Sequence, residues 1–293
     1  MDEAHILAAT GQRLAASLTR PLPPLVRFDI DGHAAGWLDR ARCDRLAQFP
    51  RIFAVNAAGV RFAAEIDTPE ARTDAMAEVA DALAAAAQLS AWRNERYAVR
   101  ASFDMPPWFY LERACARWFG IRTWAVHVNG ECTVDAERYL WFARRSLHKS
   151  IDPGCFDTLV GGGIAELESV AQALCREAWE EAGIPSALAR EARSAGHVDV
   201  TRHADDGLQR ETIWVCDLAL PAGFVPDNQD GEAIEHRRLS LGDTAALTAS
   251  TTGDVTTLDA ALVTLDYLLR RGNWPLDDDH RQALAVLCRP PPR

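Results

Sequence analysis

The sequence predicts an α+β protein of two domains, and three observations support this class. The chain has 293 residues, about twice the length of an ordinary domain. Runs rich in Val, Thr and Trp indicate strands through the second half, and one clear helix over 169–182 interrupts them. Because strands and helices do not alternate strictly along the chain, we expect a layered fold with a mixed sheet.

The first half is typical of a smaller α+β domain. Residues 5–20 predict a helix that ends before a cluster of prolines. Two short strands are expected around Asp31-Gly32, and two more on either side of residues 56–59. Further helices are expected over 41–49, 68–89 and 109–118, the second beginning at Thr68-Pro69. We place the boundary near Gly120, with residues 1–118 as the first domain and residues 119–293 as the second.

The second half is richer in strands. Its expected strands cover residues 121–130, 139–146, 197–202, 211–220 and 235–241. The expected helices are residues 169–182, 256–271 and 278–288.

The composition excludes several classes of protein. Asp and Glu number 42 against 31 Lys and Arg, so the net charge of −11 argues against nonspecific nucleic-acid binding. The seven cysteines form no CxxC pair, which disfavours a disulfide framework and a structural zinc site. The sequence has no apolar run of transmembrane length and no secretory signal. We therefore expect no membrane association and a cytoplasmic location.

An acidic helix carries the strongest chemical signal. At roughly 100° per residue, Glu177, Glu180 and Glu181 fall on one side of the predicted helix, while apolar residues form a separate face. Like charges at this spacing destabilise a helix by about 0.2–0.5 kcal/mol per pair. A solvated acidic face is the ordinary interpretation of such a run. A hard cation such as Mg²⁺ is the alternative, because it prefers oxygen ligands and would offset the repulsion.

The spacing around this helix is highly specific. It is Gly162-x5-Glu168-x7-Arg176-Glu177-Ala178-x-Glu180-Glu181-x-Gly183-Ile184. This pattern resembles the signature of the Nudix hydrolases, GX5EX7REUXEEXGU, at every fixed position. The resemblance implies the Nudix fold, a mixed sheet between helices in which the signature forms a loop, a helix and a second loop. It also implies metal-assisted hydrolysis of a diphosphate, with Mg²⁺ or Mn²⁺.

The same resemblance assigns roles to residues of the signature. It implies that the metal ligands are Glu177, Glu180, Glu181 and the carbonyl of Gly161 or Gly162. It implies that Glu168 and Arg176 form a pair that braces the loop against the helix. Members of the family differ in the residue that acts as general base. Glu177 or Glu180 is the first choice here, and Glu232 is the candidate outside the signature.

Other residues are candidates for substrate binding. Arg144, Arg145 and Lys149 precede the glycine segment and would grip the diphosphate, the alternative being an exposed strand end. Gly162 and Gly163 would allow close approach of a ligand to the backbone.

Two more segments are open to alternative interpretations. One group of residues would either stack on an organic ring or pack between domains, and packing is favoured: Trp92, Arg93, Asn94 and Tyr97. Arg210 and Glu211 would either face the cleft or pair across the sheet.

A second resemblance covers most of the chain. Residues 20–130 are similar to the domain that precedes the Nudix domain in fungal thiamine pyrophosphokinases and some plant Nudix proteins. The matching segments include Thr68-Pro69-Glu70-Ala71-Arg72-Thr73, residues 92–99 and residues 119–130. This resemblance implies hydrolysis of thiamine diphosphate, and especially of its oxidised forms, to the monophosphate. One departure is Leu167, where many signatures have glycine, and it puts the transfer of substrate preference in doubt.

Two alternatives to this function stay open. One is a pyrophosphatase for nucleotides or nucleotide sugars, acting on ADP-ribose, NADH or dNTPs. The other is a catalytically silent Nudix sensor, although such sensors usually lose carboxylates of the signature and none is lost here. The expected partner is a small-molecule diphosphate, and the expected state is a monomer or homodimer.

Overall fold

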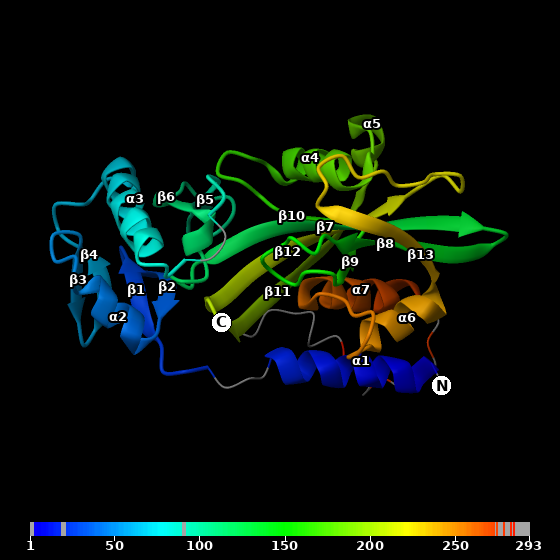
Figure 1. Cartoon of the computed structure of the whole chain (residues 1–293), viewed down its shortest axis with the longest axis horizontal. Coiled ribbons are helices and arrows are strands. Elements are labelled where there is room, and N and C mark those ends of the chain that lie inside the picture. Colours follow the sequence, from blue (N-terminus) through cyan, green and yellow to red (C-terminus); the bar gives the residue numbers. More distant parts are fainter. Residues whose placement is uncertain are drawn as a thin grey trace.

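Two large β-sheets, each with its own helices, and one two-stranded sheet organise the described part of the chain (Figure 1). This computed structural model describes residues 3–18, 22–89 and 92–272, together with Trp274, Asp278, Gln282 and Leu284. The α+β class expected from the sequence is confirmed. The predicted helix over 278–288 lies mostly outside the described residues.

The first unit contains a four-stranded sheet and a two-stranded hairpin. The order in the sheet is β2-β1-β4-β3, formed by β1 (Val26–Ile30), β2 (His33–Leu38), β3 (Phe53–Asn56) and β4 (Gly59–Phe62). The hairpin pairs β5 (Arg96–Val99) with β6 (Phe109–Glu112), and the helices are α2 (Arg40–Leu46) and α3 (Pro69–Ala85). Thr68 caps α3 by accepting a hydrogen bond from the backbone N–H of Ala71, as its position before proline predicts.

Aromatic side chains fill the core of the first unit. The ring of Phe28 lies 5.3–6.3 Å from those of Phe53, Phe62, Phe109 and Phe119. Edge-on and tilted contacts of this kind stabilise a core beyond the area that they bury. They also attach the hairpin to the sheet, because Phe109 belongs to β6.

The prediction of a helix over residues 109–118 is wrong. Phe109–Glu112 is a strand paired with β5, and only Arg113–Cys115 forms a short 3-10 turn, η1. Phe109 and Leu111 are buried, with the half-buried Tyr110 between them. This period of two fits a strand, and pairing with β5 decides the conformation.

The second unit contains a mixed seven-stranded sheet. The main order is β11-β12-β7-β8-β13, with β10 paired to β7 and β9 to β8. The bounds are β7 (Arg122–Val134), β8 (Glu137–Arg145), β9 (Phe156–Thr158), β10 (Val160–Gly163), β11 (Arg193–Ala204), β12 (Gly207–Ala219) and β13 (Ala233–Ser240). The β12–β7 pair is parallel, whereas the other pairs are antiparallel.

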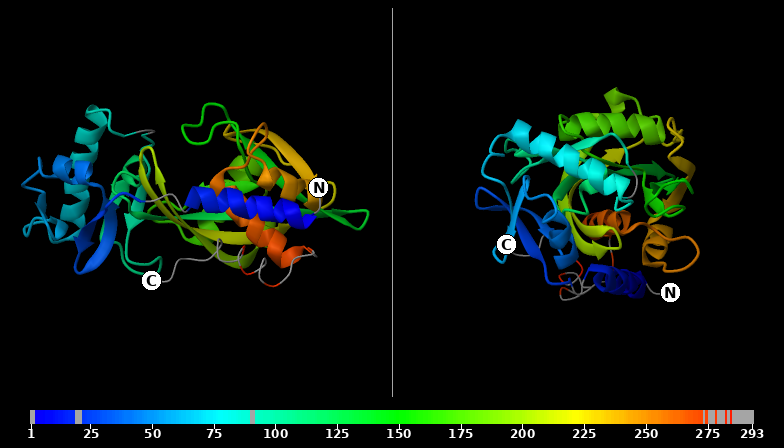
Figure 2. Two further views of the ribbon diagram at one scale, coloured as in Figure 1. Left: turned by 90° about the horizontal axis from the view of Figure 1, so that it is seen from below. Right: turned by 60° about the vertical axis from the view of Figure 1, so that its left-hand side comes forward.

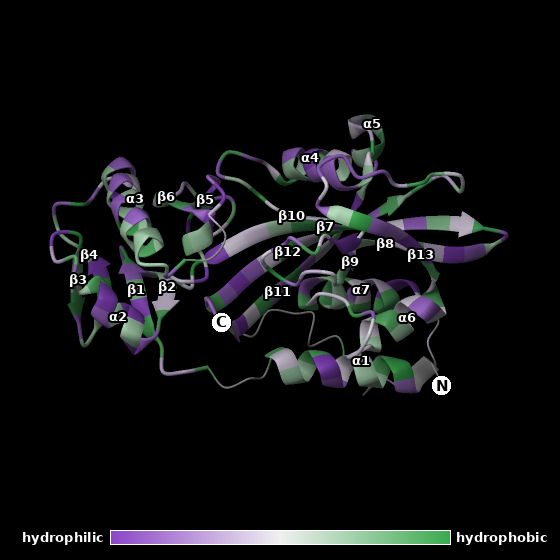
Figure 3. Ribbon diagram, viewed as in Figure 1, coloured by the Kyte–Doolittle hydropathy of each residue, from purple (hydrophilic) through white to green (hydrophobic). Residues whose placement is uncertain are grey.

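Helices cover both faces of this sheet (Figure 1). The helix α4 (Val170–Ala182), followed by the short α5 (Ser186–Ala189), packs with Trp124, Val126 and Val128 of β7. The helices α6 (Leu241–Ala249) and α7 (Leu258–Arg271) pack with Ala125 on the opposite face. Alternate residues of a strand point to opposite faces, so one strand serves both cores. Figure 3 shows hydrophobic and hydrophilic residues interspersed along these strands.

The first helix belongs to the second unit, which corrects the assignment of residues 1–118 to one domain. α1 (Glu3–Leu18) buries Leu7 and Leu14 completely in the core shared with α6 and α7. The Arg13 guanidinium donates to the backbone oxygens of Thr248 and Thr256 at 2.6 and 2.5 Å. Figure 2 shows α1 lying across α6 and α7. Residues distant in sequence cover the apolar stripe of α1.

No helix among the described residues is both long and apolar enough to span a bilayer.

Candidate active site

The helix α4 begins and ends as its sequence predicts. Ser169 and Gln172 form a reciprocal capping box at its N-terminus. Gly183 ends it in the left-handed conformation, at φ 63°. Ala178 and Ala182 are fully buried, and they hold the helix against the sheet. The acidic residues of the signature are thereby fixed above β10.

The three glycines before this helix lie in a strand, not in the expected loop. Gly161, Gly162 and Gly163 belong to β10 and pair with His127, Val126 and Ala125 of β7. A β-carbon on Gly162 would overlap the Glu177 carboxylate, and one on Gly163 would overlap the Tyr97 hydroxyl group. Glycine is therefore required at both positions, so that the side chains of Glu177 and Tyr97 can lie close to the strand.

A bidentate ion pair links the segment before α4 to the helix. Arg176 donates from Nε to Glu168 Oε1 at 2.6 Å and from Nη2 to Glu168 Oε2 at 2.8 Å. The same guanidinium donates to the Gly163 carbonyl at 3.1 Å, to Glu177 at 2.7 Å and to Glu180 at 3.2 Å. Such forked contacts fix geometry as well as charge. The Glu177 carboxylate is thus held toward β10.

The three glutamates predicted as metal ligands do not gather in one cluster. Glu181 faces the sheet and accepts a hydrogen bond from the backbone N–H of Gly161 at 2.8 Å, whereas Glu180 turns to Arg176 and is 38% exposed. Within the described part of the chain, no group of three His, Cys, Asp or Glu side chains is arranged to hold a metal ion. Arg176 binds both Glu177 and Glu180, whereas the backbone N–H of Gly161 binds Glu181.

The remaining pair still has the chemistry that a hard cation requires. Burial raises the pKa of Glu177. Burial and the nearby Glu177 charge raise the pKa of Glu181 well above its ordinary value. Buried carboxylates with raised pKa values fit a divalent cation, which would stabilise their charged forms.

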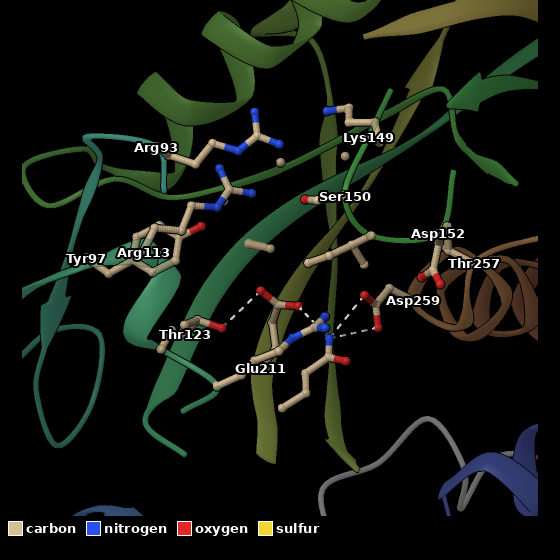
Figure 4. A pocket seen from close by; sticks show the side chains of 18 of the residues that line it. Arg93, Tyr97, Arg113, Thr123, Lys149, Ser150, Asp152, Glu211, Thr257 and Asp259 are labelled. Atoms are coloured by element: carbon tan, nitrogen blue, oxygen red, sulfur yellow. Dashed lines mark hydrogen bonds between the residues drawn. The ribbon is translucent and has the colours of Figure 1, made fainter. Parts of the chain in front are cut away.

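A cavity of about 190 Å³ lies between the two units, beside the glycines of β10. Glu177 lines it, whereas Glu180 and Glu181 do not. The walls of the cavity carry opposite charges (Figure 4).

One wall is cationic and combines Arg93 and Arg113 of the first unit with Lys149 of the second. In Figure 4 the Lys149 ammonium group points toward the two guanidinium groups. Burial, together with the charge of Arg145, lowers the pKa of Lys149. Arg113 has no local signal in the sequence, where residues 109–118 predict a helix.

The opposite wall, called the acidic wall below, contains Glu211 and Asp259, and Arg117 and Arg210 also line the cavity. Glu211 accepts hydrogen bonds from Thr123 at 3.0 Å and from Gln209 at 3.1 Å, and Gln209 also donates to Asp259 at 3.2 Å. Burial and the Asp259 charge raise the pKa of Glu211. The structure places Glu211 in the cavity, one of the two positions that the sequence left open. No local signal identified Asp259, which opens α7 far along the chain.

The two arginines predicted to bind substrate, Arg144 and Arg145, lie on opposite faces of β8. Arg145 lines the cavity and pairs with Asp157 at 3.0 Å. Arg144 pairs instead with Glu235 and Asp254, both at 2.6 Å, and its guanidinium lies over the Phe156 ring. Neighbouring residues of a strand point to opposite faces, so Arg144 faces away and its predicted role is wrong.

The mixed sheet between helices and the glutamate helix packed on a glycine strand define a Nudix-type hydrolase. The NUDIX domain model matches residues 126–257, and a domain of unknown function, DUF4743, matches residues 15–123. The chain belongs to the Nudix hydrolase family.

Plant proteins are among its relatives. Nudix hydrolase 24, chloroplastic, of Arabidopsis thaliana is 36% identical over 256 residues, covering 86% of this chain and 69% of the relative. Nudix hydrolase 20, chloroplastic, of the same plant is 34% identical over 260 residues, with the same coverages. The uncharacterized protein YJR142W of Saccharomyces cerevisiae is 29% identical over 195 residues, covering 62% of this chain and 56% of that protein. The chain is therefore a Nudix hydrolase, an enzyme class that generally uses divalent metal ions.

Proposed function

We propose that the enzyme hydrolyses a small organic diphosphate, with thiamine diphosphate or its oxidised forms as substrate and the monophosphate as product. The observation that carries this proposal is the cavity with a cationic and an acidic wall. It supports a substrate that is anionic at one end and offers positive charge or N–H donors at the other.

Thiamine diphosphate has this distribution of charge. Its phosphates complement Arg93, Arg113 and Lys149, because cations bind phosphate by charge-assisted hydrogen bonds. Its thiazolium ring is permanently positive, and its aminopyrimidine ring carries an amino group that donates hydrogen bonds. Glu211 and Asp259 complement both features. The amino group persists when the thiazolium ring is oxidised, so the oxidised forms keep a group that the acidic wall binds.

The residues of α4 and β10 would serve the reaction at phosphorus. Glu177 and Glu181, with the backbone carbonyl of Gly161 or Gly162, would hold Mg²⁺ or Mn²⁺. Such a cation would supply charge that neutralises phosphate oxygens and would lower the pKa of the attacking water. We favour Glu177 over Glu180 as the proton acceptor, because of these two residues only Glu177 lines the cavity.

A substrate panel tests the proposal. Phosphate release is measured with Mg²⁺ from thiamine diphosphate, its oxidised forms, ADP-ribose, NADH and dNTPs. We expect turnover of the thiamine compounds. Turnover of nucleotides alone would establish the nucleotide pyrophosphatase instead, and no turnover at all would favour the sensor.

A variant tests whether the acidic wall recognises the organic part of the substrate. Glu211→Gln removes one of the two carboxylates of the acidic wall and keeps the shape of the side chain. The KM for thiamine diphosphate should rise about tenfold, since a hydrogen bond to a charged group contributes about 1.5–3 kcal/mol. The KM for a nucleotide should stay unchanged. Glu191→Gln, at an exposed position, is the matched control. Equal effects on both substrates would contradict the role of Glu211.

We also propose a monomer or homodimer located in the cytoplasm. Light scattering during size-exclusion chromatography measures the first property, and fractionation of cells measures the second. A larger assembly, or recovery in a membrane or organelle fraction, would contradict these proposals.

A further inference from the structure

The cationic wall of the cavity is assembled from both units. Arg93 precedes β5, Arg113 lies in η1, and Lys149 lies in the segment between β8 and β9. Arg113 is held in place, because its Nη1 donates to the Glu95 carboxylate at 2.7 Å and its guanidinium lies 5.6 Å from the centre of the Tyr97 ring. Its position is therefore fixed by the first unit itself.

A carboxylate of the chain lies against these cations. Glu232 forms an ion pair with Lys149, and Glu232 Oε1 lies 3.8 Å from Arg93 Nη1. The Glu232 backbone is anchored, since its carbonyl accepts a hydrogen bond from the Ser146 N–H at 2.8 Å. The carboxylate thus contacts one cation from each unit and shows where an anionic oxygen is stabilised.

The charges of this wall favour a stronger anion than one carboxylate. Burial makes the charge of Lys149 costly, and the charges of Arg145, Arg113 and Arg93 add to that cost. A phosphate group carries more negative charge than a carboxylate, and its oxygens accept forked hydrogen bonds from arginine. It would therefore compete with Glu232 for the same cations.

We propose that Arg93, Arg113 and Lys149 form a phosphate subsite across the two units, and that Glu232 competes with the phosphate for it. The first unit then contributes directly to the active site of this hydrolase. The inference rests on the proposed function, because it assigns one phosphate of the diphosphate to this subsite. It also makes Glu232 a residue that tunes affinity.

The test is binding of inorganic phosphate to the full chain, measured by calorimetry in the presence of a chelator that removes divalent metal. Arg93→Gln should raise the dissociation constant about tenfold, as the loss of one charge-assisted hydrogen bond predicts. The substitution is mild, because the Arg93 side chain is 39% exposed. Arg113→Lys should also weaken binding, while it keeps a cation beside Glu95.

Two further variants make the test specific. Glu232→Gln should lower the dissociation constant about tenfold, because it removes the competing charge. Arg96→Gln is the matched control, since Arg96 lies three residues from Arg93, pairs with Glu166 at 2.8 Å and does not line the cavity. It should leave phosphate binding unchanged.

The outcomes separate this proposal from the proposed function. An unchanged dissociation constant in Arg93→Gln would overturn the subsite, and an unchanged or higher one in Glu232→Gln would overturn the competition. Phosphate binding to metal-free protein requires neither turnover nor a particular organic group. A substrate panel that yields only nucleotides would therefore refute the thiamine proposal and leave this one standing.

Discussion

The substitution Gly162→Ala tests how closely β10 and α4 must approach for activity. A methyl group at this position would stand 2.5 Å from Glu177 Oε2, and nearer still to Oε1 and Cδ. Ordinary contacts begin at 3.4 Å. The Gly162 backbone lies in a strand without a positive φ, so alanine fits the backbone and the Glu177 carboxylate must move instead.

The size of the effect follows from this displacement. The carboxylate must retreat by about 1 Å or more, and a misplacement of about 1 Å in an active site lowers a rate about 100-fold. We therefore expect kcat to fall about 100-fold, equivalent to about 2.7 kcal/mol in the barrier. The fold should survive, since the main loss is the hydrogen bond between Arg176 and Glu177, which contributes about 1.5–3 kcal/mol.

The assay measures kcat with saturating Mg²⁺ alongside thermal unfolding. Gly242→Ala in α6 is the matched control, because its methyl group would meet nothing closer than Ser240 Oγ at 3.9 Å. It should leave kcat unchanged. If Gly162→Ala kept kcat within about threefold of the parent, against the 100-fold loss expected, the position of Glu177 would not control the reaction. A collapse of stability without residual folded protein would show that the carboxylate is unable to move.

Three further predictions concern the carboxylates and the first helix. Glu181→Gln should keep the fold, because the substitution only removes a charge that burial disfavours. It should cut kcat by orders of magnitude, because a metal ligand is lost. A normal kcat in this variant would refute the metal-ligand role of Glu181. Burial raises the pKa of Asp217, but hydrogen bonds from Arg270 outweigh it and hold that pKa below its ordinary value. Arg270→Met should therefore lower the free energy of unfolding at pH 7 by about 2 kcal/mol. This difference should shrink as the pH falls below about 4, because Asp217 protonates first in the unfolded state and protonates in the folded protein only at the lower pH set by its depressed pKa. Equal differences at pH 3 and pH 7 would contradict the ion pair. Leu14→Ala should lower the free energy of unfolding by about 2–5 kcal/mol, because Leu14 is fully buried. Leu22→Ala, at an exposed position, should not lower it. Similar values for both variants would refute the packing of α1 on the second unit.

The sequence predicted those elements that local chemistry specifies. Periodicity and caps predict the capped helix α4, the helix α3 after Thr68 and the second-unit strands β7 and β12. The failures occurred where the partner of a segment decides its conformation. Residues 109–112 pair with β5, and Gly161–Gly163 pair with β7, so both are strands. Pairing of this kind joins segments whose proximity no local pattern reports.

The candidate site shows the same division. The spacing of the signature placed Glu168, Arg176 and Glu177 together, because residues within about two turns of one helix and its flanking segment have few relative positions available. The same spacing did not predict that Glu180 and Glu181 would turn to different partners. That outcome depends on β10, which approaches the helix from outside.

By itself, therefore, the sequence determined the family signature, the acidic helix and the α+β class, since each depends on neighbours along the chain. Only the tertiary structure decided the charge of the cavity walls, the turn of Arg144 away from the cavity and the docking of α1 on the second unit. Arg93 and Asp259 face one cavity from segments more than half the chain apart. Their meeting depends on how the sheets and helices pack together, because long-range burial sets such contacts and local spacing does not.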